Sequence, residues 1–107
     1  MNDASWKRVL GLVGLGVRGR LAVVGVDRVR EAAGKGTLRL AIVAGDASSN
    51  SRDKVLPLLT AKKVRVVDGA AAVALGGATG RETTAVVGIV DVQLAKGIRA
   101  IVDGANA

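Results

Sequence analysis

The chain has 107 residues and a formal net charge of +7, and its only aromatic residue is Trp6. Because it contains neither cysteine nor histidine, a disulfide framework, a thiolate metal site and the commonest general base are excluded. The length fits a single domain over residues 1–107. This basic balance indicates a nucleic acid or an anionic membrane surface as partner. Arginine outnumbers lysine, which disfavours a merely solubilising charge because arginine suits phosphate recognition better.

Helices and strands are predicted to alternate along the chain. Apolar spacing predicts a helix over 4–17, a short strand over 21–24 and a second helical face over 26–33 that ends at 34–36. A buried strand over 38–44 leads to a third helix, which a serine at 48, 49 or 51 caps and which Pro57 must kink or restart. A strand over 64–67, a short Ala-rich helix over 70–75 and a strand over 84–90 follow, and a last helix has its inner face at 94–102, with the final residues expected to fray.

This order predicts the α/β class, as a three-layer α/β/α sandwich with a mixed sheet of about four strands. No signal peptide is evident, and no apolar run approaches the ~20 residues that span a bilayer. We therefore expect a soluble, cytoplasmic protein without a membrane partner.

Two glycine-rich segments look like phosphate loops but lack essential parts. Residues 14–19 match GxGxxG, yet the next strand starts at Leu21 and leaves no room for the helix that would hold a pyrophosphate. We interpret them as a helix end and turn. Lys35 is followed by Gly36 instead of Ser or Thr, so the second segment is rejected as well. No pair of carboxylates has a spacing that implies a catalytic site, so we expect no enzyme activity, cofactor or metal ion.

Arginines flank several predicted loops. Arg18 and Arg20 bracket the turn before the first strand, and Arg81 follows Gly80. An α/β order can bring such loops to one end of the sheet, where the N-terminus of the second helix at Gly25 offers free N–H groups to phosphate.

Two acidic residues near these loops have competing interpretations. Asp46 ends the buried strand, so a binding role and a cap before the third helix are about equally favoured. Asp27 is expected to cap the second helix, whether or not it also touches a ligand.

Four short motifs occur in an order that suggests a family. They are the strand with Ala-Gly-Asp at 40–46, Leu56-Pro-Leu-Leu59, the pair Leu75-Gly76, and Gly80-Arg-Glu-Thr-Thr84. Together they resemble the L-seven-Ae/L-thirty-e ribosomal-protein family over residues 10–98, most closely its small bacterial YlxQ-type members. The resemblance also accounts for Pro57, which some members carry at that point.

The resemblance implies an α/β/α sandwich that binds kink-turn RNA at one edge. The family's Gly-x-Asn-Glu-x-x-Lys segment falls on this chain with Gly25 kept, Asp27 in place of Asn, Arg28 in place of Glu and Glu31 in place of Lys. The family's loop over an extruded base corresponds to residues 81–84.

We therefore expect a protein that binds structured RNA, with ribosomal RNA and the ribosome as candidate partners. The residues expected to bind RNA are Arg18, Arg20, Gly25, Asp27, Arg28, Glu31, Asp46, Arg81, Glu82, Thr83 and Thr84. Two alternatives stay open. One is a protein–protein module that kept the fold and lost the RNA site, which the changes at 27, 28 and 31 favour. The other, weaker one is a nucleotide-binding enzyme.

Overall fold

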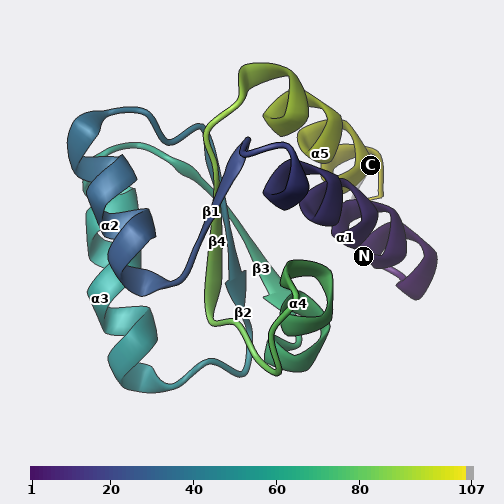
Figure 1. The fold of residues 1–107 in the computed structure, drawn as a ribbon, viewed down its shortest axis with the longest axis horizontal. Helices are drawn as coiled ribbons and strands as arrows, with labels where there is room; N and C mark the ends of the chain where they lie inside the picture. The colour runs from purple at the N-terminus through teal and green to yellow at the C-terminus, as the bar shows by residue number, and fades with distance from the viewer. Residues whose placement is uncertain (106–107) are drawn as a thin grey trace.

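A computed structural model describes residues 1–105 as five helices and a four-stranded sheet (Figure 1). In chain order the elements are α1 (Asp3–Arg18), β1 (Ala22–Val24), α2 (Val26–Lys35), β2 (Leu40–Ala44), α3 (Ser49–Ala61), β3 (Arg65–Ala70), α4 (Ala72–Thr79), β4 (Val86–Ile89) and α5 (Val92–Ala105). Residues 14–19 form the end of α1 and its C-cap, as interpreted from the sequence.

The sheet is mixed and has the strand order β1-β4-β2-β3. Strand β4 is antiparallel to both β1 and β2, whereas β2 and β3 are parallel. Strands β1, β2 and β3 therefore end at one edge, where β4 begins. We call this edge the carboxyl edge and the opposite one the amino edge. Strands β1 and β3 form the two sides of the sheet.

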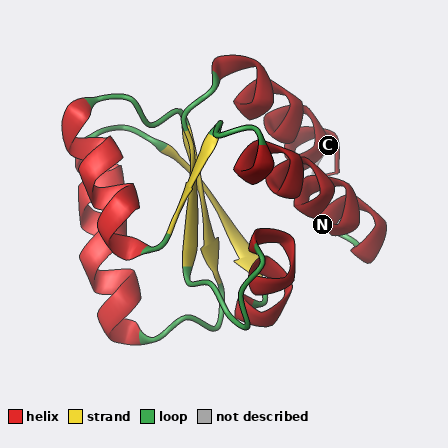
Figure 2. Ribbon diagram, viewed as in Figure 1, coloured by secondary structure: helices red, strands yellow, loops and turns green. Residues whose placement is uncertain are grey.

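Helices cover both faces of this sheet, which confirms the three-layer α/β/α prediction (Figure 2). Helices α2 and α3 lie on one face, over a cluster of buried side chains that includes Val29, Val55 and Leu59. Helices α1, α4 and α5 lie on the other face, over Val13, Leu75 and further buried apolar residues. All five residues of β2 are buried, as a strand at the centre of two such layers must be.

Trp6 lies outside the two apolar clusters proper and is only partly buried. It packs from α1 against β3, where a β-carbon at Gly69 would lie 3.5 Å from its Cζ2 atom. The buried core of the described residues is therefore built from Val, Leu, Ile and Ala.

The structure settles two points that concern the predicted helices. Helix α3 runs through Pro57 without a restart, because Ser48 caps its start and Val55 and Leu59 anchor it to the core. The helix predicted over 70–75 is α4, which begins at Ala72 and continues to Thr79. Residue 70 belongs instead to β3, whose last carbonyl accepts a hydrogen bond from Gly45 N at 2.9 Å.

The remaining boundaries shift by a few residues. Strand β4 starts two residues later than predicted, because Thr84 N donates to the carbonyl of Ala72 in α4. Helix α5 extends to Ala105, and the expected fraying concerns residues 106 and 107, which lie outside the described residues. Over residues 1–105, no helix is both long enough and apolar enough to cross a membrane.

An ion pair ties α3 to the carboxyl edge and predicts an acid-sensitive stability. Arg52 donates to both carboxylate oxygens of Asp68, at 2.7 and 3.3 Å, and to the carbonyl of Ala44 at 2.8 Å. The hydrogen bond from Arg52 lowers the pKa of Asp68. Because this pKa is lower in the folded state, the pair stabilises the fold above the unfolded value of about 3.9, and this contribution is lost as pH falls through the lowered pKa.

We therefore expect the thermal midpoint to fall between about pH 5 and pH 2, and to fall less steeply in Asp68→Asn. Thermal melts followed by circular dichroism at several pH values measure this difference. Some dependence remains in the variant, because ion pairs also lower the pKa values of Glu31 and Asp103. Parallel curves for the two proteins would contradict the assignment to Asp68.

Candidate nucleic-acid interface

Three of the predicted loops meet at the carboxyl edge. Gly25 N donates to the carbonyl of Val86 at 3.0 Å, which joins the start of α2 to the start of β4. Ala44 N donates to the carbonyl of Ala85 at 2.8 Å, which joins the end of β2 to the same segment. The loops at Gly25, at 45–46 and at 81–84 are thus gathered at one end of the sheet, as the sequence predicted.

The turn with Arg18 and Arg20 was expected at the same end, and this part of the prediction is wrong. The turn precedes β1 and therefore lies at the opposite, amino edge, but β1 between the two edges is only three residues long. A groove of about 450 Å³ runs along β1, an outermost strand of the sheet. It is lined by Val17, Arg20, Ala22, Val23, Val24, Arg28, Thr79 and Arg81. We call it the arginine groove.

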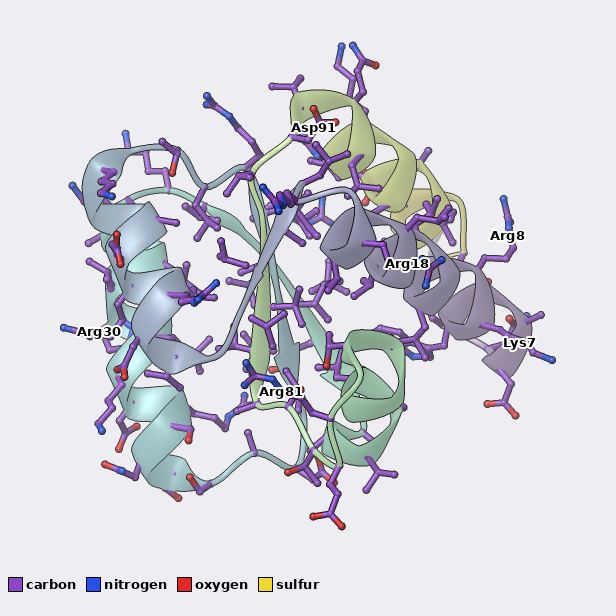
Figure 3. The ribbon with its side chains drawn as sticks, viewed as in Figure 1. Lys7, Arg8, Arg18, Arg30, Arg81 and Asp91 are labelled. Atoms are coloured by element: carbon purple, nitrogen blue, oxygen red, sulfur yellow. The ribbon has the colours of Figure 1, made fainter. Side chains whose placement is uncertain are left out.

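Its three arginines come from three separate segments: the turn before β1, the first turns of α2, and the loop after α4. All three side chains are exposed, and within residues 1–105 none has a carboxylate within 4.0 Å. Figure 3 shows Arg81 between the sheet and α4, far from Lys7 and Arg8 in the N-terminal half of α1. The groove is therefore a concentration of uncompensated positive charge.

Gly25 lies at the N-terminus of α2, next to the Arg81 side chain that lines this groove. Its φ of 98° is disfavoured for residues with a side chain, and a β-carbon there would lie 3.7 Å from Nη1 of Arg81. As the N-cap residue, Gly25 has no side chain that could accept a hydrogen bond from the first amides of α2. The first hydrogen bond within the helix runs from Val29 N to the Gly25 carbonyl. Free N–H groups, the positive helix end and a guanidinium thus lie together, an arrangement suited to an anion.

Asp27 does not take the expected capping role. The N-cap of α2 is Gly25, and Asp27 is an exposed residue of the first helical turn. The prediction of an Asp27 cap is wrong because the helix begins one residue before it.

The loop after α4 is positioned by a contact with a glycine inside that helix. A β-carbon at Gly76 would lie 2.5 Å from the carbonyl oxygen of Glu82 and 2.7 Å from that of Arg81. The loop can cross α4 this closely only because Gly76 has no side chain. Arg81 N also donates to the Gly76 carbonyl at 2.8 Å, and Gly80 turns the chain at φ 77°. In the Leu75-Gly76 pair of the sequence, Leu75 is therefore a core residue and Gly76 is the point of α4 against which the loop packs.

Two predicted contact residues, one buried and one exposed, stabilise this edge through hydrogen bonds. Thr84 is 4% exposed, and its Oγ1 lies 2.9 Å from that of Thr79, so it shapes the loop while Glu82 and Thr83 stay exposed. Asp46 accepts from Ala72 N at 2.8 Å. It caps α4 and not the third helix, because the carboxyl end of β2 lies beside the start of α4.

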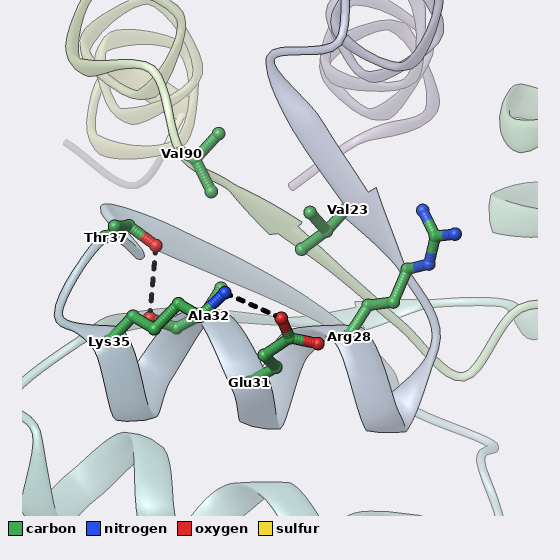
Figure 4. Close-up of a pocket in the computed structure, with 7 residues that line it drawn as sticks. All are labelled: Val23, Arg28, Glu31, Ala32, Lys35, Thr37 and Val90. Carbon is green, nitrogen blue, oxygen red and sulfur yellow. Dashed lines mark hydrogen bonds and ion pairs between the residues drawn. The ribbon is translucent and has the colours of Figure 1, made fainter.

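Two further predicted residues lie away from the groove lining. Arg18 folds back along α1, where a β-carbon at Gly14 would lie 3.5 Å from its Nη1. Glu31 pairs with Lys35 at 2.8 Å on the exposed face of α2, and this hydrogen bond lowers the pKa of Glu31 (Figure 4). Lys35 thus offsets the negative charge of Glu31. Its spacing of four residues from Glu31 was the available signal in the sequence.

Solved structures similar to this chain include an RNA-binding protein. A 15.5 kDa RNA-binding protein of Giardia lamblia matches with a TM-score of 0.80 and 25% identity, over 99% of this chain and 91% of that one. A protein of unknown function from Bacillus halodurans matches with a TM-score of 0.82 and 27% identity, over 90% of this chain and 97% of that one. No protein-family model and no curated protein matches the sequence.

Proposed function

We propose that this protein binds structured RNA through the arginine groove and the carboxyl edge. The observation that carries the proposal is the convergence of Arg20, Arg28 and Arg81 on one groove beside the uncapped N-terminus of α2. The similarity to the Giardia RNA-binding protein supports it. Phosphate contacts of this kind supply much of the affinity for nucleic acids, whatever their sequence.

The same surface suggests how a bent RNA would be recognised. The grooves of an A-form duplex hide most base edges, so the protein would read a distorted or single-stranded region. Arg28 can donate two hydrogen bonds to a guanine edge, and Asp27 next to it can accept from an amino group. The exposed residues Glu82 and Thr83 would cover a displaced base. The motifs shared with the L-seven-Ae/L-thirty-e family extend the proposal to kink-turn-like RNA and to ribosomal RNA.

A filter-binding titration over salt tests this proposal. The probes are a kinked RNA stem with tandem G·A pairs and a plain duplex of the same length. We expect tighter binding to the kinked stem and a slope of log affinity against log salt of about −2 to −3, one counterion for each arginine. Equal affinity for the two RNAs would exclude kink recognition, and affinity independent of salt would exclude RNA binding through these arginines.

Arg20 also predicts opposite effects on stability and binding. It occupies the position after the C-cap of α1 with φ 61°, where Leu21 N donates to the Gly16 carbonyl, a geometry that glycine adopts without strain. Arg20→Gly removes a left-handed cost of about 1–2 kcal/mol and adds a backbone entropy cost of about 0.5–1 kcal/mol.

We expect this variant to be as stable as the wild type or up to about 1.5 kcal/mol more stable, and to bind RNA more weakly. Chemical denaturation and filter binding on the same samples measure the two effects. A variant with lower stability, or with unchanged RNA affinity, would argue against a binding role for this arginine.

A protein–protein module is the second candidate, and exposed leucines favour it. Leu15 is 57% and Leu21 38% exposed on either side of the turn that carries Arg20. A pull-down with and without nuclease separates the two candidates. A partner that stays bound after nuclease treatment would support the module, whereas RNA binding predicts its release.

A further inference from the structure

The arginine groove is one of three hollows that follow helix α2 from its start to its end. A second, of about 370 Å³, lies along the flank of the helix and shares Val23 and Arg28 with the groove (Figure 4). A third, of about 320 Å³, lies at the amino edge between the ends of α2 and α3. It is lined by Ala33, Gly36, Leu38, Arg39, Lys62, Lys63 and Val64.

Positive charge continues along this whole path. Arg28 and Lys35 line the flank, and Figure 4 shows the Arg28 guanidinium turned away from Glu31. Arg39, Lys62 and Lys63 are all exposed at the far end, and within the described part of the chain none has a carboxylate within 4.0 Å. Glu31 is the one carboxylate among the residues that line the three hollows, and it is paired with Lys35.

The backbone at Lys63 has a left-handed conformation that a residue with a side chain rarely adopts. Lys63 has φ 57° after the C-cap of α3, with Val64 N donating to the Leu59 carbonyl at 2.9 Å. At the corresponding position α2 has Gly36, as this motif favours. Within residues 1–105, Arg20 and Lys63 are the two non-glycine residues with positive φ. Both side chains are cations, and Arg20 lines the arginine groove whereas Lys63 lines the third hollow. Strained positions that persist often mark function.

We propose that the phosphate backbone of the bound RNA continues from the arginine groove along α2 to Arg39, Lys62 and Lys63. This inference rests on the proposed RNA binding and extends its footprint to the C-terminal ends of α2 and α3. Helix α2 has ten residues and is therefore about 15 Å long, which corresponds to roughly four phosphates along one strand of a duplex. The cluster of Arg39, Lys62 and Lys63 would bind the phosphates of an RNA stem next to the kink, and it would do so independently of the base sequence of that stem.

The test compares one short and two long RNAs and uses two triple variants. The short RNA is a kinked stem that ends at the groove, and each long RNA extends one of its two stems by about six base pairs. One variant carries Arg39→Gln, Lys62→Gln and Lys63→Gln. The matched control carries Lys7→Gln, Arg8→Gln and Lys96→Gln, which removes the same charge from exposed positions of α1 and α5.

We expect the wild type and the control variant to bind one of the long RNAs about tenfold more tightly than the short one. The variant at 39, 62 and 63 should bind the short RNA within about twofold of the control variant and lose the preference for the long RNA. Lys63→Gly should reduce the same preference while its unfolding midpoint stays at or above that of the wild type, which excludes misfolding as the cause.

Three results would overturn the inference. They are a wild type without a preference for length, a variant at 39, 62 and 63 that keeps the preference, and a control variant that loses it. A different outcome would assign the cluster to a membrane instead. In that case the wild type would bind phosphatidylserine vesicles, and the variant at 39, 62 and 63 would lose this binding while it kept its preference for the long RNA. Failure of the proposed function is distinguishable, because the wild type would then not bind the short kinked RNA at all.

Discussion

Replacing Gly76 with alanine is expected to lower the thermal midpoint by roughly 10–20 °C, equivalent to about 2–3 kcal/mol of overpacking. The new β-carbon would lie 2.5 Å from the Glu82 carbonyl oxygen and 2.6 Å from its carbon. Because these are backbone atoms, no change of rotamer can relieve the clash. The loop that carries Arg81 and Glu82 must then move away from α4, which also moves Arg81 away from Gly25. Differential scanning calorimetry measures the first effect, and RNA affinity measures the second.

Gly77→Ala is the matched control for this prediction. Gly77 follows in the same helix and is exposed, and a β-carbon there would meet no atom within 4 Å beyond its own helix and chain neighbours. Alanine favours helix by about 1 kcal/mol over glycine, so this variant should be as stable as the wild type or more stable. A midpoint for Gly76→Ala equal to that of Gly77→Ala would show that the loop does not depend on the glycine.

The double variant Arg28→Ala, Arg81→Ala is expected to lose RNA affinity by roughly 30-fold to 1,000-fold, from about 1–2 kcal/mol for each arginine. Both side chains are exposed and make no hydrogen bond within residues 1–105, so the fold should be unaffected. The slope of log affinity against log salt should become shallower by about two. Since the two side chains line one groove, their single effects need not add.

Arg8→Ala is the control for lost charge alone. It removes one arginine from α1 at a place far from Arg81 (Figure 3). We expect it to change RNA affinity by less than about twofold, since separated surface charges are largely screened at physiological salt. An equal loss for Arg8→Ala and Arg28→Ala would indicate a general effect of net charge and would exclude a defined groove.

Local sequence signals predicted most of the fold. The apolar run at 40–44 became the fully buried central strand, and glycines at 36 and 80 ended α2 and α4 with left-handed caps. The errors arose where distant residues decide. The start of α4 is fixed by Asp46, 26 positions earlier in the chain. Core packing at Val55 and Leu59 carries α3 past Pro57 without a restart, a choice between kink and restart that local propensity left open.

The site was predicted as a set of loops but not in the directions of its side chains. Strand order was enough to bring Gly25 and the loop at 81–84 to one edge. Burial of Thr84 depends on Thr79, and the different positions of Arg18 and Arg20 depend on the turn between them. The contact of the 81–84 loop with Gly76 joins two segments through space, and the sequence analysis did not predict it.

The position of Trp6 gives the protein a built-in fluorescent reporter of folding. It is the only tryptophan, and the chain contains no tyrosine. It packs against β3, whereas the arginine groove lies along β1 at the other side of the sheet. Its emission should therefore follow unfolding while being little quenched by nucleobases in the groove. Unfolding can thus be followed without a label, both in the absence and in the presence of added RNA.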